Sequence, residues 1–157
     1  MARIWIVDDD EAVRDLMGDL VADMGHEIRL FAYPKELLDA YHPRAADAII
    51  TDVRMQSLDG RELTKALLEK DPSALILILT GYPSINDAVE LIRMGAVDYL
   101  QKPVRAEEIK VRIDRALQSR DIMKRFYKNR SLTWILICAI PLLVLLGVVL
   151  GRMLKTH

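Results

Sequence analysis

Polar and charged residues follow four apolar, strand-like segments of this 157-residue chain, at the point where each segment ends. They are Asp8, Asp9 and Asp10 after residues 3–7, Asp52 after 48–51, Thr80 after 74–79 and Lys102 after 97–101. Carboxylates suit Mg²⁺ and can act as nucleophiles, while a hydroxyl and a cation suit the oxygens of a phosphoryl group. The combination predicts phosphorylation of an aspartate with the help of Mg²⁺.

The segments that must position these residues alternate between strand-like and helix-like patterns. Five apolar runs predict strands over residues 3–7, 27–31, 48–51, 74–79 and 97–101. Amphipathic stretches predict helices at 13–24, 34–41, 60–70, 85–94 and 107–117. Apolar strands separated by such helices indicate an α/β fold, a doubly wound five-stranded parallel sheet covered on both faces. Ligands bind at the carboxyl ends of the strands in such sheets, so we expect the polar residues to share one edge.

The fourth predicted helix has clear ends and a regular apolar stripe. Ser84 is a suitable N-cap, and Gly95 is suitable for ending the helix. The apolar residues that recur at helical spacing, and that we therefore expect to face the sheet, are Ile85, Ala88, Val89 and Ile92.

Each polar group also has an interpretation that involves no chemistry. Aspartates after a strand can form a turn and place negative charge at a helix N-terminus, and for Asp10 this is the better interpretation. Thr80 followed by Gly81 suits a turn, and Lys102 followed by Pro103 suits a solvated loop. Their joint occurrence at the ends of several strands favours the chemical interpretation.

Five short motifs resemble those of one known family in both order and spacing. They are Ile6–Asp10, Thr51–Met55, Leu58–Gly60, Leu79–Gly81 and Tyr99–Pro103. Over roughly residues 2–120 the sequence resembles a response regulator receiver domain, and residues 80–103 are most similar to receivers of the nitrogen-regulation type. The resemblance implies the flavodoxin-like receiver fold and a place in a bacterial two-component system.

The resemblance also implies which residues bind the metal and accept the phosphoryl group. Asp52 would be the phosphoacceptor, taking the group from a sensor histidine kinase or a histidine phosphotransfer protein. The Mg²⁺ ligands would be Asp9, Asp8 acting through water, Asp52 and the backbone carbonyl of Arg54. The protein would then be no enzyme beyond its own phosphorylation and dephosphorylation.

Three further residues would respond to the phosphoryl group. The resemblance implies that Thr80 moves to donate a hydrogen bond to it and that Lys102 pairs with it. Tyr99 would turn inward as Thr80 moves, although a half-buried aromatic residue of a strand is an equally good interpretation. New contacts made only in the phosphorylated state would bias the adjacent loop and the fourth helix.

One position departs from the family pattern. The family usually has proline after the methionine of the phosphoacceptor loop, and this chain has Gln56. The change removes a rigid constraint on the turn but no predicted ligand. Arg54 and Tyr82 lie where the family adjusts the lifetime of the phosphoryl group.

The region after residue 120 has a different composition. Residues 121–131 are basic, and residues 131–151 contain no charged side chain. We predict a transmembrane helix over 132–151, since twenty residues of helix span about 30 Å, the thickness of the hydrocarbon layer. The basic segment precedes the predicted span and a short tail, 152–157, follows it, so the positive-inside rule places the receiver (1–120) on the cytoplasmic side of a bacterial inner membrane.

The same region suggests contacts with lipid or a second copy. The basic segment could bind anionic lipid, and Gly147 with Gly151 has the spacing that packs two transmembrane helices into a homodimer. We predict no nucleic-acid partner, because the net charge is −1 and the sequence shows neither a helix-turn-helix pattern nor a phosphate loop.

Three alternatives stay open at this point. A phosphatase of the haloacid-dehalogenase class also uses an aspartate after its first strand, but it wants Asp-x-Asp-x-Thr/Val, whereas Asp10 is followed by Glu11 and Ala12. The chain could instead be a soluble interaction module whose apolar tail packs on a partner or joins a larger output assembly. A receiver that has lost its signalling role is the third alternative.

Overall fold

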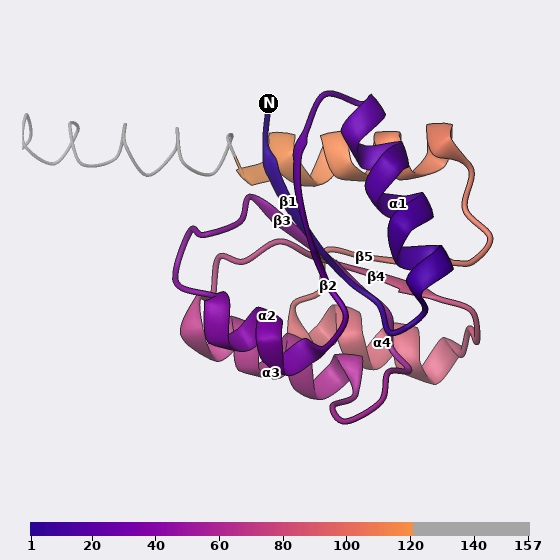
Figure 1. The fold of residues 1–157 in the computed structure, drawn as a ribbon. Helices are drawn as coiled ribbons and strands as arrows, with labels where there is room; N and C mark the ends of the chain where they lie inside the picture. The colour runs from indigo at the N-terminus through magenta and orange to yellow at the C-terminus, as the bar shows by residue number, and fades with distance from the viewer. Residues whose placement is uncertain (121–157) are drawn as a thin grey trace, which may run out of the picture. The chain divides into compact units, whose positions relative to one another are not determined.

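The computed structural model describes residues 1–120, which form alternating strands and helices (Figure 1). The strands are β1 (Arg3–Val7), β2 (Glu27–Phe31), β3 (Ala48–Thr51), β4 (Ile76–Thr80) and β5 (Asp98–Gln101). The helices are α1 (Glu11–Asp23), α2 (Pro34–Ala40), α3 (Gly60–Lys70) and α4 (Ile85–Met94), and a further helix covers residues 106–120. The predicted order of elements is confirmed, with β4 beginning two residues later than expected.

The five strands form one parallel sheet in the order β2-β1-β3-β4-β5. Val7 at the end of β1 is in register with Phe31 of β2 and with Thr51 of β3. The predicted doubly wound five-stranded fold is therefore confirmed. The chain winds outward in opposite directions from β1 and β3, so the crevice between these two strand ends is where such sheets bind ligands.

Two apolar cores cover the two faces of the sheet. Trp5 and Val7 of β1 contribute to the core under α2, α3 and α4. Ile4 and Ile6 contribute to the other core, which also contains Met17 of α1 and is closed by the 106–120 helix (Figure 1). This alternation follows from the two-residue period of a strand, and it anchors both sides of β1. The loop after β1 therefore starts from a fixed position.

The orientation of α4 differs from the prediction. Three of the four residues expected to face the sheet are solvent-exposed: Ile85 is 84% exposed, and Val89 and Ile92 are each 45% exposed. The buried residue of α4 is Leu91, which packs into the core on that face. The apolar periodicity was real, but it marks an uncovered stripe. The cap prediction is confirmed, since Ser84 accepts a hydrogen bond from the Asp87 N–H and Gly95 ends the helix.

Asp10 has the structural role expected for it. Its side chain caps α1 by accepting hydrogen bonds from the backbone N–H groups of Ala12 and Val13. The Asp10 carboxylate is thus hydrogen-bonded to the start of α1, so Asp8 and Asp9 are the two aspartates after β1 that remain as candidates for the site.

A buried carboxylate, Asp71, lies at the end of α3, before β4 begins. Asp71, at the end of α3, accepts hydrogen bonds from the Tyr41 hydroxyl, the Arg44 N–H and both the N–H and hydroxyl of Ser73. Burial alone would raise the pKa of Asp71, but the hydrogen bonds from Ser73, Arg44 and Tyr41 outweigh it and lower the pKa below its ordinary value. Ionised Asp71 therefore stabilises the folded state.

We expect Asp71→Asn to lower the free energy of unfolding by about 2 kcal/mol at pH 7, because the charged acceptor is lost from a buried network. A carboxyl whose pKa is lowered by folding stabilises the protein above its unfolded pKa. The deficit should therefore shrink as the pH falls below about 4. Urea unfolding at several pH values measures this, with the exposed Asp39→Asn as the control. A deficit that does not change with pH would contradict the assignment.

The predictions for the C-terminal region lie outside the described residues. This applies to the basic segment 121–131, the transmembrane helix 132–151, the tail 152–157 and the Gly147/Gly151 contact. Within residues 1–120, no helix is both long and apolar enough to cross a membrane.

Candidate functional site

Two of the predicted carboxylates contact the same cation, Lys102, at the carboxyl ends of the strands. Lys102, directly after β5, places its Nζ 2.5 Å from Asp8 Oδ2 and 2.6 Å from Asp52 Oδ2. Asp8 follows β1 and Asp52 follows β3, so the three side chains come from strand ends far apart in the sequence. Since one nitrogen contacts both carboxylates, Asp8 and Asp52 lie close enough to share a single ion.

Burial sets the electrostatics of this group. Burial raises the pKa of Asp8, against the lowering effect of its hydrogen bond and charge interaction with Lys102. For Lys102, burial alone would lower the pKa, but the hydrogen bonds to Asp52 and Asp8 outweigh it and raise the pKa. Lys102 is therefore held as an ammonium ion. Asp52 is the more accessible acid, with 11% of its side chain exposed against 6% for Asp8.

The loop between β3 and α3 contributes two backbone donors. The N–H of Arg54 donates to Asp52 Oδ1 at 3.2 Å. The N–H of Gln56 donates to Asp9 Oδ2 at 3.0 Å, which connects the loop after β3 to the loop after β1. All three predicted acidic ligands thus have a donor, and within residues 1–120 Asp9 is the one of the three that makes no ion pair.

Thr80 and Tyr99 are positioned next to α4. Thr80, at the end of β4, is fully buried, and its hydroxyl accepts a hydrogen bond from the Tyr82 N–H. Tyr99 of β5 is partly buried against the core, and its hydroxyl accepts from the N–H of Ser84, the N-cap of α4. Within residues 1–120, neither side chain hydrogen-bonds to Asp8, Asp52 or Lys102. Both connect the sheet edge to the start of α4.

Sequence reasoning missed two contacts around the site. The guanidinium of Arg54 lies 4.5 Å from the centre of the Tyr82 ring, a cation–π contact that joins the loops after β3 and β4. Arg14 of α1 donates to the backbone carbonyl of Asp8 at 3.0 Å. The sequence places Arg54 and Tyr82 near the predicted site, but no spacing in the sequence predicts that these two side chains are in contact.

Gly60 permits a close backbone approach beside Asp52. Its N–H donates to the Val53 carbonyl at 2.8 Å, where α3 begins. A Cβ atom added at Gly60 would lie 2.1 Å from the Asp52 carbonyl oxygen and 2.8 Å from the Val53 Cα. Only glycine fits here, so the start of α3 can lie directly against the strand end that carries Asp52.

The donor set fits Mg²⁺ in type. Mg²⁺ takes one or two carboxylates, retains several waters and accepts carbonyl oxygen, and the crevice offers Asp8, Asp9, Asp52 and the Arg54 carbonyl. Within residues 1–120 no three His, Cys, Asp or Glu side chains form a ready-made metal cluster. Lys102 lies within ion-pair distance of two of these acids, Asp8 and Asp52.

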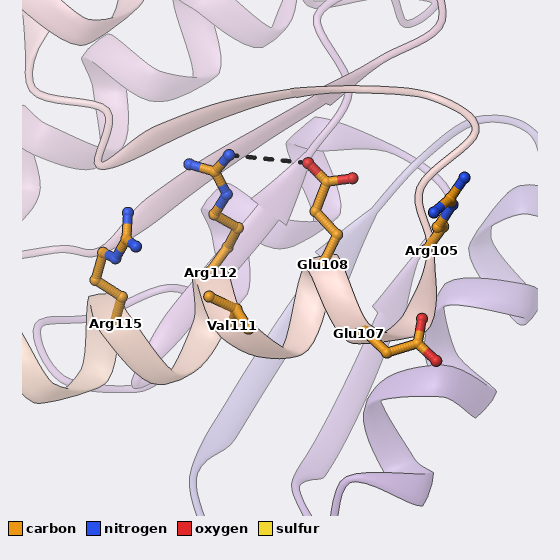
Figure 2. Close-up of a pocket in the computed structure, with 6 residues that line it drawn as sticks. All are labelled: Arg105, Glu107, Glu108, Val111, Arg112 and Arg115. Carbon is orange, nitrogen blue, oxygen red and sulfur yellow. Dashed lines mark ion pairs between the residues drawn. The ribbon is translucent and has the colours of Figure 1, made fainter.

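A hollow lies along the 106–120 helix (Figure 2). It is lined by Arg105, Glu107, Glu108, Val111, Arg112 and Arg115. Arg112 makes ion pairs with Asp98 at 2.9 Å and with Glu108 at 3.8 Å. None of the residues predicted for phosphoryl chemistry lines this hollow, so the candidate site is the crevice at the sheet edge.

Comparisons with known proteins identify the family of this fold. The pattern of the response regulator receiver domain matches residues 4–114. The chain therefore belongs to the response regulator receiver domain family, the receivers of two-component systems. Domains of this family generally bind Mg²⁺ for phosphorylation.

Two curated relatives are longer than this chain. The transcriptional regulatory protein FixJ of Bradyrhizobium diazoefficiens is 35% identical over 116 residues, which cover 74% of this chain and 57% of FixJ. The DNA-binding transcriptional regulator NtrC of Escherichia coli K12 is 31% identical, over 73% of this chain and 24% of NtrC. The matched part thus spans little more than half of FixJ and about a quarter of NtrC.

Solved structures share the fold. The receiver domain protein of Clostridium thermocellum gives a TM-score of 0.75 at 26% identity, covering 78% of this chain and 99% of that one. NtrX of Brucella abortus gives 0.76 at 30% identity, over 80% of this chain and 29% of NtrX.

Proposed function

We propose that Asp52 accepts a phosphoryl group from a phosphohistidine on a sensor kinase or a histidine phosphotransfer protein. The observation that carries the proposal is the contact of a single ammonium group, Lys102 Nζ, with both Asp8 and Asp52. A cation held against the acceptor is what a phosphoryl group needs as charge spreads over its oxygens.

In the proposed reaction a carboxylate oxygen of Asp52 attacks the phosphorus atom of the donor. An oxygen–phosphorus bond forms while the nitrogen–phosphorus bond breaks, and the imidazole nitrogen retains the electron pair. Lys102 then pairs with an oxygen of the transferred group. The chain acts on its own side chain, so we do not propose turnover of a separate substrate.

We propose that Asp8, Asp9, Asp52 and the Arg54 carbonyl hold Mg²⁺ during this step. When bound, the ion neutralises charge on the carboxylates and on the transferring group. The protein residues orient the acceptor: the Arg54 N–H holds one oxygen of Asp52, and Lys102 holds the other.

For the output we propose a protein partner that contacts the exposed face of α4. Phosphorylation adds about −1.5 to −2 charges beside Thr80 and Lys102, and a shift of the Thr80 hydroxyl would break its contact with the Tyr82 N–H. Tyr99 bonds to the N-cap of α4, so a movement of this ring would reach the helix. The exposed apolar side chains on that side are Tyr82, Ile85, Val89 and Ile92.

We further propose that residues 132–151 anchor the receiver to the bacterial inner membrane, with residues 1–120 in the cytoplasm. The support is the uncharged run between Arg130 and Arg152 and the basic segment before it. Alkaline carbonate washing of membranes tests this, since a spanning protein stays in the pellet. Release into the wash would favour the soluble interaction module.

The absence of a nucleic-acid partner stays a prediction. FixJ and NtrC are named as transcriptional regulators, and the part of each that matches this chain is limited to 57% and 24% of their lengths. A gel-shift assay with the full chain and genomic DNA fragments tests the prediction directly.

The phosphorylation itself is tested by mass spectrometry of the full chain after incubation with Mg²⁺ and acetyl phosphate. We expect the mass of one phosphoryl group to be gained and to map to Asp52 after digestion. Omitting Mg²⁺ should prevent labelling. A label on Asp8 would favour the phosphatase alternative, and no label with a competent donor would contradict the proposed function.

A further inference from the structure

The carboxylate of Asp9 is held differently from the other two acids of the crevice. Asp8 and Asp52 both contact the Lys102 ammonium. Asp9 instead accepts a hydrogen bond from the backbone N–H of Gln56, at 3.0 Å. Asp9 is also more exposed than Asp8. Without this hydrogen bond, such a side chain would be free to turn outward into solvent.

The Gln56 N–H opposes that movement. A charge-assisted hydrogen bond to Oδ2 compensates part of the negative charge and fixes the orientation of the carboxylate, while Oδ1 accepts no hydrogen bond from residues 1–120. Gln56 lies in the same loop as Arg54, whose carbonyl is a proposed ligand, and Arg54 is itself tied to Asp52. The bond therefore ties Asp9, on the loop after β1, to the loop that carries the proposed Arg54 ligand.

We propose that the backbone N–H of Gln56 is a positioning group for Asp9 and tightens Mg²⁺ binding in this chain. The inference rests on the proposed function. A proline, the residue that receivers usually have at this position, has no N–H and could not make the bond. Position 56 would then determine how well the metal ligand is organised before the ion arrives.

The substitution Gln56→Pro removes the N–H. Ser57 has a positive φ of 77°, as the second corner of a type II turn has, so we expect the loop to accept a proline before it. Gln56→Ala is the matched control, because it removes the side chain and keeps the N–H. Both variants should unfold in urea at similar concentrations without metal.

The experiment is calorimetric titration of the full chain with Mg²⁺ alone. We expect Gln56→Pro to bind Mg²⁺ about tenfold more weakly than wild type and Gln56→Ala to stay within about twofold of it. Equal affinities for the two variants, or tighter binding by Gln56→Pro, would overturn the inference while leaving the proposed function intact. A wild type that binds no Mg²⁺ would instead contradict the proposed function.

A second measurement needs no substitution in the loop. In metal-free wild type, the Gln56 amide proton should exchange slowly with solvent because it is bonded to Asp9. In Asp9→Ala this exchange should become faster, while the Val53-bonded amide of Gly60 stays protected. Equal exchange of the Gln56 amide in the two proteins would overturn the inference even if Gln56→Pro failed to fold.

Discussion

Asp52→Asn is expected to reduce labelling by acetyl phosphate more than about 1000-fold, because an amide oxygen cannot replace the attacking carboxylate. The neighbouring acids should not compensate. Only 6% of the Asp8 side chain is exposed, and burial raises its pKa. Asp9 is bonded to the loop through Gln56. Intact-mass measurement over a time course with Mg²⁺ measures the loss.

The variant should remain folded. Replacing Asp52 leaves Lys102 paired with Asp8 alone, which removes a repulsion between two partly buried carboxylates. We therefore expect the metal-free Asn variant to be at least as stable as wild type toward urea. Asp10→Asn is the matched control, since it changes an acid on the same edge that caps α1, and it should label normally. Labelling of Asp52→Asn at the wild-type rate would contradict the assignment of the acceptor.

The strand ends could be predicted from sequence because they depend on local pattern alone. Each apolar run identifies a strand, the parallel sheet follows from the intervening helices, and the end of each run then falls on one edge. Asp8, Asp52 and Lys102 meet there for that reason, as the contacts of Lys102 confirm. The structural role of Asp10 at the start of a helix followed equally from its place in the sequence, although the cap that its side chain makes was not itself predicted.

The rest depends on which elements touch, and periodicity does not contain that information. An apolar stripe on α4 predicted burial, but the neighbours of α4 cover Leu91 and leave Ile85 exposed. The Gln56–Asp9 bond involves a backbone N–H, which almost every residue carries, so the side-chain type at position 56 gives no sign of it. Gly60 belongs to one of the motifs that carry the family resemblance. The need for glycine at this position, however, comes from the backbone atoms of Asp52 and Val53, which no sequence pattern places there.

Gly60→Ala is expected to lower the free energy of unfolding by about 3 kcal/mol or more. Replacing glycine by alanine at a position that alanine can adopt usually increases stability, because alanine reduces the conformational entropy of the unfolded chain. Here the new methyl group would lie 2.1 Å from the Asp52 carbonyl oxygen. The clash is with backbone at the end of a buried strand, so no side-chain rotation relieves it. The helix start or the strand end must move.

That movement should affect the chemistry as well as the stability. Displacing the backbone at Asp52 and Val53 would shift the carboxylate away from Lys102 and break the Gly60–Val53 hydrogen bond. We expect the labelling rate of the folded protein to fall. The rate is measured without urea, at a temperature where the variant is still folded. Gly81→Ala is the matched control, since a methyl group there meets no atom within 4 Å, and its stability should change by less than about 1 kcal/mol. If Gly60→Ala were as stable as Gly81→Ala, the close approach of α3 to Asp52 would be wrong, and with it the reason that this crevice holds its acceptor in place.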